Sequence, residues 1–215
     1  MSCQQRDVTS MIACGVIILA AGASSRMGKP KLLLPWGKTS VLGHLVTQWQ
    51  AAGARQIAVV HAVGDQTTSG ELDRLGFPAC NRITNLKPER GMFSSIQCAA
   101  AWGDWNSALT HWVIVLGDQP HLRRETLRQL IEFAAAHPEK ICQPGRRGRP
   151  RHPVVLPKAI FERLKDSREE TLKQFLQNSA SAVTLREMDD PGLDFDMDTP
   201  ADYEKSLWLI AGDAG

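Results

Sequence analysis

Three apolar runs stand out along the chain, and none of them alternates between apolar and polar positions. They are CGVIILA (14–20), QIAVVHA (56–62) and HWVIVLG (111–117). Strands of a parallel sheet are buried on both faces and therefore read as continuous apolar runs rich in valine and isoleucine. We predict three buried parallel strands at these positions.

Segments with apolar residues at helical spacing follow these runs, at 41–53, 94–102 and 125–137. The first ends at Gly53, a residue that favours the C-terminal end of a helix, and the third ends before Pro138. The second begins with Ser94 or Ser95 as its N-cap. Strands that alternate with helices predict an α/β fold with a mostly parallel sheet, whose ligands bind at the carboxyl ends of the strands.

The last third of the chain has a less regular pattern. A basic loop at 143–153 is followed by a short strand at 154–156, helical stretches near 158–165 and 171–177, and an acidic segment at 194–203. We find no internal repeat and no low-complexity linker. A length of 215 residues fits one domain. We place this domain at 12–210, between an N-terminal extension (1–11) and a C-terminal tail (211–215).

Composition and charge restrict the kind of ligand to expect. Lys and Arg number 25 against 23 Asp and Glu, so the net charge of +2 creates no overall field for nucleic acid or a membrane surface. The apolar run 11–21 is too short to cross a bilayer, and the segment before it lacks the positive charge of a signal peptide. Five separated cysteines without a C-x-x-C pair indicate reduced thiols. We predict a cytoplasmic protein that binds neither nucleic acid nor membrane.

The loop after the first strand combines small residues with positive charge. Small side chains at 20–23 let the backbone approach a ligand closely, and successive N–H groups of such a turn favour an anion. Arg26, Lys29 and Lys31 add three cations. The combination predicts a polyphosphate site; the alternative is a solvated basic turn.

Two well-known phosphate loops do not fit this segment. A Walker A loop has four residues between its glycine and its Gly-Lys pair, whereas Gly22 and Gly28 enclose five, and Lys29 is followed by Pro30. A dinucleotide fingerprint requires a second glycine where Ser24 stands.

Instead, LAAGASSRMGKPK (19–31) resembles the signature L-A-A-G-x-S-x-R-M-G-x-x-K of the molybdopterin nucleotidyltransferases, the MobA-like NTP transferases. The resemblance continues, in chain order, in NLKPERGMFSSI (85–96), LGDQP (116–120), RHPVVL (151–156) and DFDMDTPAD (194–202). LAAG together with GDQP is most similar to the molybdenum cofactor cytidylyltransferase branch.

The resemblance implies a three-layer, Rossmann-like nucleotidyltransferase fold. It implies transfer of CMP from CTP to the phosphate of molybdopterin or its molybdenum form, with Mg²⁺ and with release of pyrophosphate. The nucleotide-binding residues would be Leu19, Ala20, Ala21, Gly22, Ser24, Arg26, Lys31, Ser94 and Ser95. Arg26, Lys31 and Asp118 would be catalytic, and Arg151 and His152 would bind the acceptor. A molybdoenzyme or its maturation factor would be a transient partner.

Carboxylates provide the candidate metal ligands. Asp118 directly follows a buried strand, where a carboxylate is costly unless it binds a cation or caps a turn. Asp194, Asp196 and Asp198 alternate, so in an extended segment all three would point the same way. The resemblance places a second metal contact at Asp196 or Asp198, and the sequence does not choose between them.

Other readings remain open at this point. RRGRPR (146–151) contains the R-G-R-P core of a minor-groove hook, although the near-neutral charge and the single copy disfavour DNA binding. Arg151 stands where the family usually has glycine, which puts the identity of the acceptor in doubt. The rival functions are a guanylyltransferase, a transferase that acts on another phosphorylated small molecule, and a nucleotide-binding protein without turnover.

Overall fold

The computed structural model describes residues 12–22, 26–179 and 183–211. The predicted extension at 1–11, the tail residues 212–215 and Ser24 lie outside the described residues. Within them, no helix is long and apolar enough to cross a membrane.

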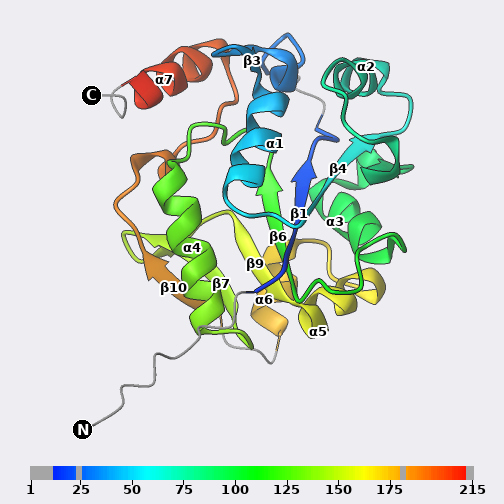
Figure 1. The fold of residues 1–215 in the computed structure, drawn as a ribbon, viewed down its shortest axis with the longest axis vertical. Helices are drawn as coiled ribbons and strands as arrows, with labels where there is room; N and C mark the ends of the chain where they lie inside the picture. The colour runs from blue at the N-terminus through cyan, green and yellow to red at the C-terminus, as the bar shows by residue number, and fades with distance from the viewer. Residues whose placement is uncertain (1–11, 23–25, 180–182, 212–215) are drawn as a thin grey trace, which may run out of the picture.

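A mostly parallel sheet forms the centre of the molecule, as predicted (Figure 1). In spatial order its strands are β10 (Val183–Glu187), β7 (Ile141–Arg146), β9 (Val154–Pro157), β6 (His111–Leu116), β1 (Cys14–Leu19), β4 (Gln56–Ala62) and β5 (Arg82–Asn85). A two-residue strand, β8 (Arg149–Pro150), pairs with β7, and β2 (Pro35–Trp36) and β3 (Thr39–Ser40) form a separate hairpin. Among the described strands of the main sheet, β8 and β9 run antiparallel to their neighbours, and the others run parallel to one another. The three predicted strands are β1, β4 and β6.

Helices cover both faces of the sheet, which gives the expected three layers (Figure 1). They are α1 (Val41–Ala51), α2 (Gln66–Arg74), α3 (Met92–Ala101), α4 (Arg124–Ala136), α5 (Lys158–Phe161), α6 (Leu172–Asn178) and α7 (Pro200–Ala211). Val16 and Ile18 of β1 pack into the core under α1 and α4, whereas Ile17 packs into the core under α3, α5 and α6. Successive residues of a strand point to opposite faces, so one short apolar run supplies both cores.

Two local predictions require correction. Helix α3 begins at Met92 with Gly91 as its N-cap, so Ser94 and Ser95 are not N-caps. Gly91 has a φ of 84°, a left-handed conformation that glycine adopts without strain. The segment 143–153 is not a loop throughout, because β7 continues to Arg146 and turns back into β8.

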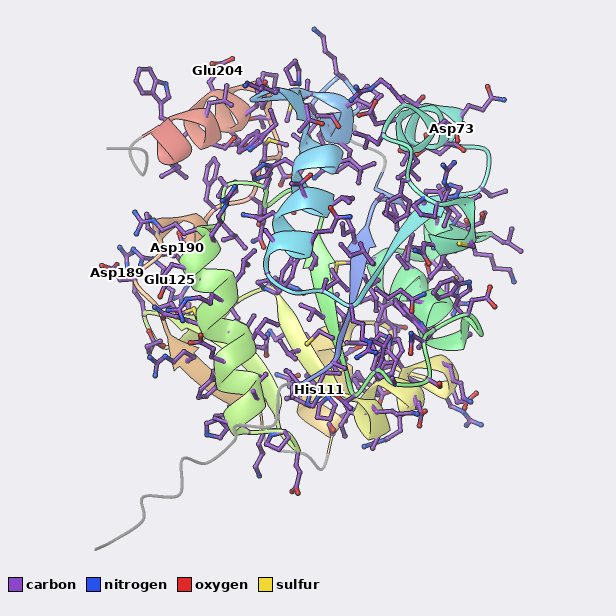
Figure 2. The ribbon with its side chains drawn as sticks, viewed as in Figure 1. Asp73, His111, Glu125, Asp189, Asp190 and Glu204 are labelled. Atoms are coloured by element: carbon purple, nitrogen blue, oxygen red, sulfur yellow. The ribbon has the colours of Figure 1, made fainter. Side chains whose placement is uncertain are left out.

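The carboxyl ends of the parallel strands lie at one edge of the sheet. β1, β4, β5, β6, β7 and β10 all end there, and the antiparallel β9 begins there. The chain after β10 returns along the same edge, where the Met197 amide donates a hydrogen bond to the carbonyl of Asp118 (3.0 Å). The opposite edge carries the start of β6, marked by His111 in Figure 2.

Candidate active site

The loop after β1 is anchored in the core by buried residues that directly follow its charged residues Arg26 and Lys31. Met27 and Leu32 are buried, and between them lie Gly28, with a φ of 69°, and the short segment to Lys31. At the start of the loop, Ala20 donates a backbone hydrogen bond to Val60 (2.8 Å). Two buried anchors therefore hold Arg26 and Lys31 at the carboxyl edge of the sheet.

A cleft of about 990 Å³ opens beside this loop. Its lining includes seven of the residues predicted from the sequence: Leu19, Ala20, Ala21, Gly22, Lys31, Ser95 and Asp118. The lining also includes the end of β4 and the segments that follow β4 and β5, with Asp65, Thr68 and Glu89, which the sequence analysis did not single out. The cleft is large enough for a ligand of nucleotide size.

Lys31 joins two aspartates that lie far apart in the sequence. Its Nζ atom lies 2.8 Å from Oδ2 of Asp118 and 3.4 Å from Oδ1 of Asp198. Nη2 of Arg26 lies 2.9 Å from the other oxygen of Asp198. The three central side chains expose only 15%, 20% and 26% of their surface (Lys31, Asp118 and Asp198), so water screens these ion pairs less than it screens a surface pair.

Asp118 has an oxygen that a cation could satisfy. Its Oδ1 atom is buried and accepts no hydrogen bond within the part of the chain that the structure describes. A buried carboxylate oxygen without a partner is costly, and a divalent cation is a suitable partner. Among the described residues, however, no three acidic, histidine or cysteine side chains form a group that could hold a metal alone. The protein oxygens thus fit a cation that takes its remaining ligands from a substrate and water.

Asp194 and Asp196 have partners of their own, and Asp194 belongs to a 3-10 turn, so the extended segment predicted to carry all three aspartates does not include Asp194. Asp196 Oδ1 accepts a hydrogen bond from Gln119 Nε2 (2.9 Å). Burial raises the pKa of Asp196, and the charge of Asp118 raises it further. Asp194 ends a 3-10 turn (Pro191–Asp194) and is bound by arginines.

Ser94 and Ser95 are held by a residue that the sequence analysis did not select. Asn85, at the end of β5, donates through Nδ2 to the hydroxyls of Ser94 (2.8 Å) and Ser95 (2.9 Å). Ser94 in turn donates to the Gly91 carbonyl (2.7 Å). Ser95 lines the cleft, whereas the hydroxyl of Ser94 forms its hydrogen bond within the turn before α3. In the sequence, Asn85 was indicated only as the first residue of the family-like segment NLKPERGMFSSI (85–96).

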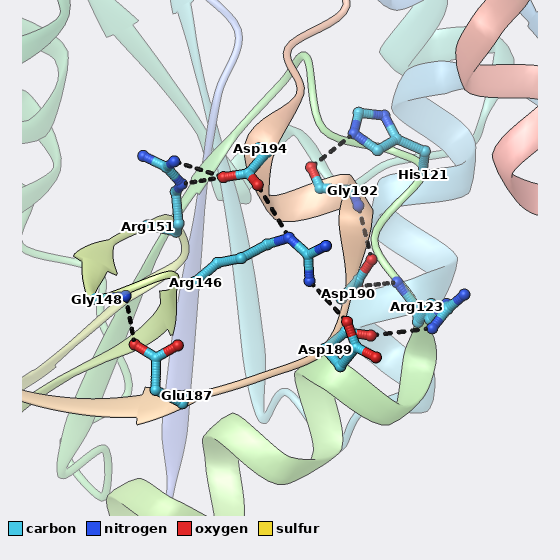
Figure 3. A network of polar contacts seen from close by, with 10 residues as sticks. All are labelled: His121, Arg123, Arg146, Gly148, Arg151, Glu187, Asp189, Asp190, Gly192 and Asp194. Atoms are coloured by element: carbon cyan, nitrogen blue, oxygen red, sulfur yellow. Dashed lines mark hydrogen bonds and ion pairs between the residues drawn. The ribbon is translucent and has the colours of Figure 1, made fainter.

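Arg151 belongs to a polar network on the β7 side of the edge (Figure 3). Its Nε atom donates to Oδ1 of Asp194 (3.0 Å), and Nε of Arg146 donates to Oδ2 of the same carboxylate (3.0 Å). Arg146 also pairs with Asp189 (2.9 Å). The hydrogen bonds from Arg151 and Arg146 hold the pKa of Asp194 below its usual range. Arg151 does not belong to the described lining of the cleft.

His152 follows Arg151 and precedes a cis peptide bond to Pro153. Burial lowers its pKa to about 4, against the charge of Asp118, which raises it. Its Nδ1 atom is buried and has no hydrogen-bond partner among the described residues. The ring is therefore neutral near pH 7, and its interaction with Asp118 places it on the β9 side of the same edge.

Comparison with known proteins extends over most of the chain. The family model of the MobA-like NTP transferase domain matches residues 16–183. A molybdenum cofactor cytidylyltransferase from Escherichia coli K12 is 26% identical over 196 residues, which are 90% of this chain and 95% of that protein. A bifunctional protein GlmU from Sorangium cellulosum So ce56 is 34% identical over 118 residues, 53% of this chain. The matched part spans only 24% of that GlmU.

The fold is also found in solved structures. The crystal structure of Rv0371c from Mycobacterium tuberculosis H37Rv has a TM-score of 0.73 and 25% identity, and the match covers 93% of this chain and 99% of that one. A structure of Rv0371c in complex with manganese has a TM-score of 0.68 and 22% identity, over 93% and 100% of the two chains.

Proposed function

The chain belongs to the MobA-like NTP transferase family, and on that premise we propose that it transfers CMP from CTP to the phosphate of molybdopterin or its molybdenum form. The observation that carries the proposal is Lys31, which joins Asp118 and Asp198 beside a cleft lined by the family's signature loop. The similarity to the Escherichia coli cytidylyltransferase over 90% of the chain supports cytidine as the nucleoside.

The proposed reaction needs positioning and charge neutralisation rather than a general base. An oxygen of the acceptor phosphate attacks the α-phosphorus of CTP, and the bond between that phosphorus and the bridging oxygen to the β-phosphate breaks. The electron pair of the broken bond leaves with pyrophosphate. Because the attacking oxygen is already an anion, no proton has to be removed, and the cations of Lys31 and Arg26 stabilise the charge that develops on the leaving group.

Backbone and hydroxyl groups would hold the nucleotide. We assign its binding to the N–H groups and small side chains from Leu19 to Gly22, to Ser24, and to Ser95. Ser94 would act indirectly, since its hydroxyl bonds the turn before α3. Arg151 and His152 would face the acceptor from the β7 and β9 side of the same edge.

We assign a divalent cation, Mg²⁺, to Asp118 and Asp198. When bound, such an ion would neutralise the oxygens of the triphosphate and polarise them. The unpartnered Oδ1 of Asp118 supports this assignment, and the manganese complex of Rv0371c is in keeping with it. Asp198 is preferred over Asp196 because it shares Lys31 with Asp118, whereas Asp196 is occupied by Gln119. We further propose that the protein acts in the cytoplasm and passes its product to a molybdoenzyme or to the maturation factor of one.

The deciding experiment is pyrophosphate release with Mg²⁺, molybdopterin in its molybdenum form, and each of CTP, GTP, ATP and UTP in turn. Release with CTP alone is the expected result. Release with GTP alone would replace this proposal by a guanylyltransferase. Binding of CTP without release would reject molybdopterin as the acceptor, and other phosphorylated small molecules would then be assayed.

A further inference from the structure

Lys31 lies where a metal ion would have to bind. Its Nζ atom contacts Oδ2 of Asp118 at 2.8 Å and Oδ1 of Asp198 at 3.4 Å. These are the two carboxylates to which the proposed function assigns the divalent cation. The ammonium group therefore satisfies, within the protein, the same negative charges that the cation would satisfy.

An ammonium group and a divalent cation cannot both bind Oδ2 of Asp118 and Oδ1 of Asp198 at the same time. Cations repel each other at contact distance, and the shielding of this cluster from solvent strengthens that repulsion. The second carboxylate oxygen on Asp198 is also engaged, by Arg26. Asp118 Oδ1 is the one oxygen of the two carboxylates that has no partner among the described residues.

Among the residues that the structure describes, none completes a three-ligand metal site at this position. Within the described ranges no group of three acidic, histidine or cysteine side chains could hold a metal, and Asp196 is bound by Gln119. Mg²⁺ demands six ligands and is usually bound by one or two carboxylates together with substrate phosphates and water. The triphosphate would supply the missing oxygens and would give Lys31 a new anionic partner.

We propose that Lys31 competes with the divalent cation for Asp118 and Asp198, so that the cation binds together with the nucleotide and not before it. The inference rests on the proposed function for the identity of the metal ligands. In the resting protein the side chain of Lys31 neutralises the two carboxylates. When the triphosphate enters the cleft, Lys31 moves to the phosphate oxygens and leaves the carboxylates to the cation. Lys31 thereby sets the order in which the two ligands assemble.

The test measures the binding of Mn²⁺, without nucleotide or acceptor, to the whole protein by electron paramagnetic resonance of the free ion. Lys31→Met removes the charge and keeps the length of the side chain. We expect it to bind Mn²⁺ about tenfold more tightly than the wild type, or better, because one cation has left the two carboxylates. Lys38→Met is the matched control, since Lys38 is exposed between β2 and β3, does not line the cleft and forms no ion pair with the described residues; its affinity should equal that of the wild type.

Two further variants test whether the gain in Mn²⁺ affinity comes from the loss of the Lys31 charge and whether it requires Asp118. Lys31→Arg keeps the charge and should keep the weak binding, which separates the loss of charge from a disturbance of the fold. Asp118→Asn in the Lys31→Met background should abolish the gain, because the tighter site requires that carboxylate. Thermal unfolding of each variant confirms that it is folded at the temperature of the titration.

Equal Mn²⁺ affinities for the wild type and Lys31→Met would overturn the proposal. Binding too weak to measure in both would also overturn it, since the vacated carboxylates would then not take the cation. These outcomes are independent of the proposed reaction. A protein that binds Mn²⁺ as expected but releases no pyrophosphate with any nucleotide would keep this inference and lose the proposed function.

Discussion

Gly117 lies so close to Leu19 that a Cβ atom added to it would stand 2.8 Å from the Leu19 carbonyl oxygen. The same atom would stand 2.8 Å from Cδ2 of Leu32. The ends of β1 and β6 can therefore approach only because position 117 carries no side chain. This approach brings Asp118 beside the loop that carries Lys31.

Gly117→Ala should consequently reduce both stability and nucleotide binding. The added methyl group meets a backbone oxygen that cannot move aside easily, so we expect a loss of about 1–3 kcal/mol in the free energy of unfolding. Urea denaturation measures this loss. Gly103→Ala is the control, because nothing lies within 4 Å of its Cβ position; equal stabilities of the two variants would contradict the prediction.

Asp118→Asn should lower turnover by at least about a hundredfold, as expected for loss of a charge that stabilises the transition state. The fold should persist, since the substitution keeps the size of the side chain. Pyrophosphate release measures the rate, and binding of CTP in the absence of metal shows that the cleft is intact. A rate near that of the wild type would remove Asp118 from the reaction.

Asp198→Asn and Asp196→Asn should lower turnover to different degrees. Asp198 shares Lys31 with Asp118, so its loss should reduce turnover to a degree similar to that of Asp118→Asn. Asp196 accepts from Gln119, and Asn at this position retains an oxygen that can accept the same hydrogen bond. We expect less than about a tenfold reduction for Asp196→Asn, in line with the modest cost of one neutral hydrogen bond. The reverse order of the two rates would assign the metal to Asp196.

Arg151→Ala should raise the KM for the acceptor about tenfold or more, as expected when a hydrogen bond to a charged group is lost, and leave the KM for CTP unchanged. Arg147→Ala is the matched control, since Arg147 lies exposed at the tip of the β7–β8 turn. Steady-state kinetics with each substrate varied in turn distinguishes the two. Equal acceptor KM values for both variants would exclude Arg151 from the acceptor site.

Acid should destabilise the protein partly through His111, which lies at the edge of the sheet opposite to the cleft (Figure 2). Burial lowers the pKa of His111, so the unfolded chain binds a proton more readily than the folded chain. Stability therefore decreases as the pH falls below the ordinary histidine pKa of about 6.5. His111→Gln should lose less stability between about pH 7 and about pH 5 than the wild type. Urea denaturation at the two pH values tests this, and identical losses would show that His111 does not contribute.

The sequence predicted those parts of the fold that are encoded by continuous local patterns. β1, β4 and β6 are buried on both faces, so each leaves an unbroken apolar run. β5 reads RITN and β10 reads VTLRE, and neither run is apolar enough to stand out. Helix α2 has a polar sequence, QTTSGELDR, and was not predicted either. These elements depend on their neighbours in space more than on their own residues.

The residues of the candidate site also differ in how far the sequence could predict them. Arg26 and Lys31 could be selected because they lie in one short signature, and Asp118 because it follows a buried strand. The contact between Lys31 and Asp198 joins residues 167 positions apart. No local pattern encodes that distance, which is why the sequence could not choose between Asp196 and Asp198. Asn85 escaped selection because its role depends on the two hydroxyls it reaches.

The reversed direction of β9 has a consequence for how such a protein can change over time. β9 begins at the edge where β1 and β6 end, directly after Arg151 and His152, so these two residues stand at that edge. Every described residue that lines the cleft lies between positions 19 and 118, whereas the residues assigned to the acceptor come later. Substitutions around Arg151 and His152 can accumulate while the residues that line the cleft, and Asp198 with them, stay fixed. A family with this architecture can therefore evolve specificity for a new acceptor while its nucleotide-binding site stays unchanged.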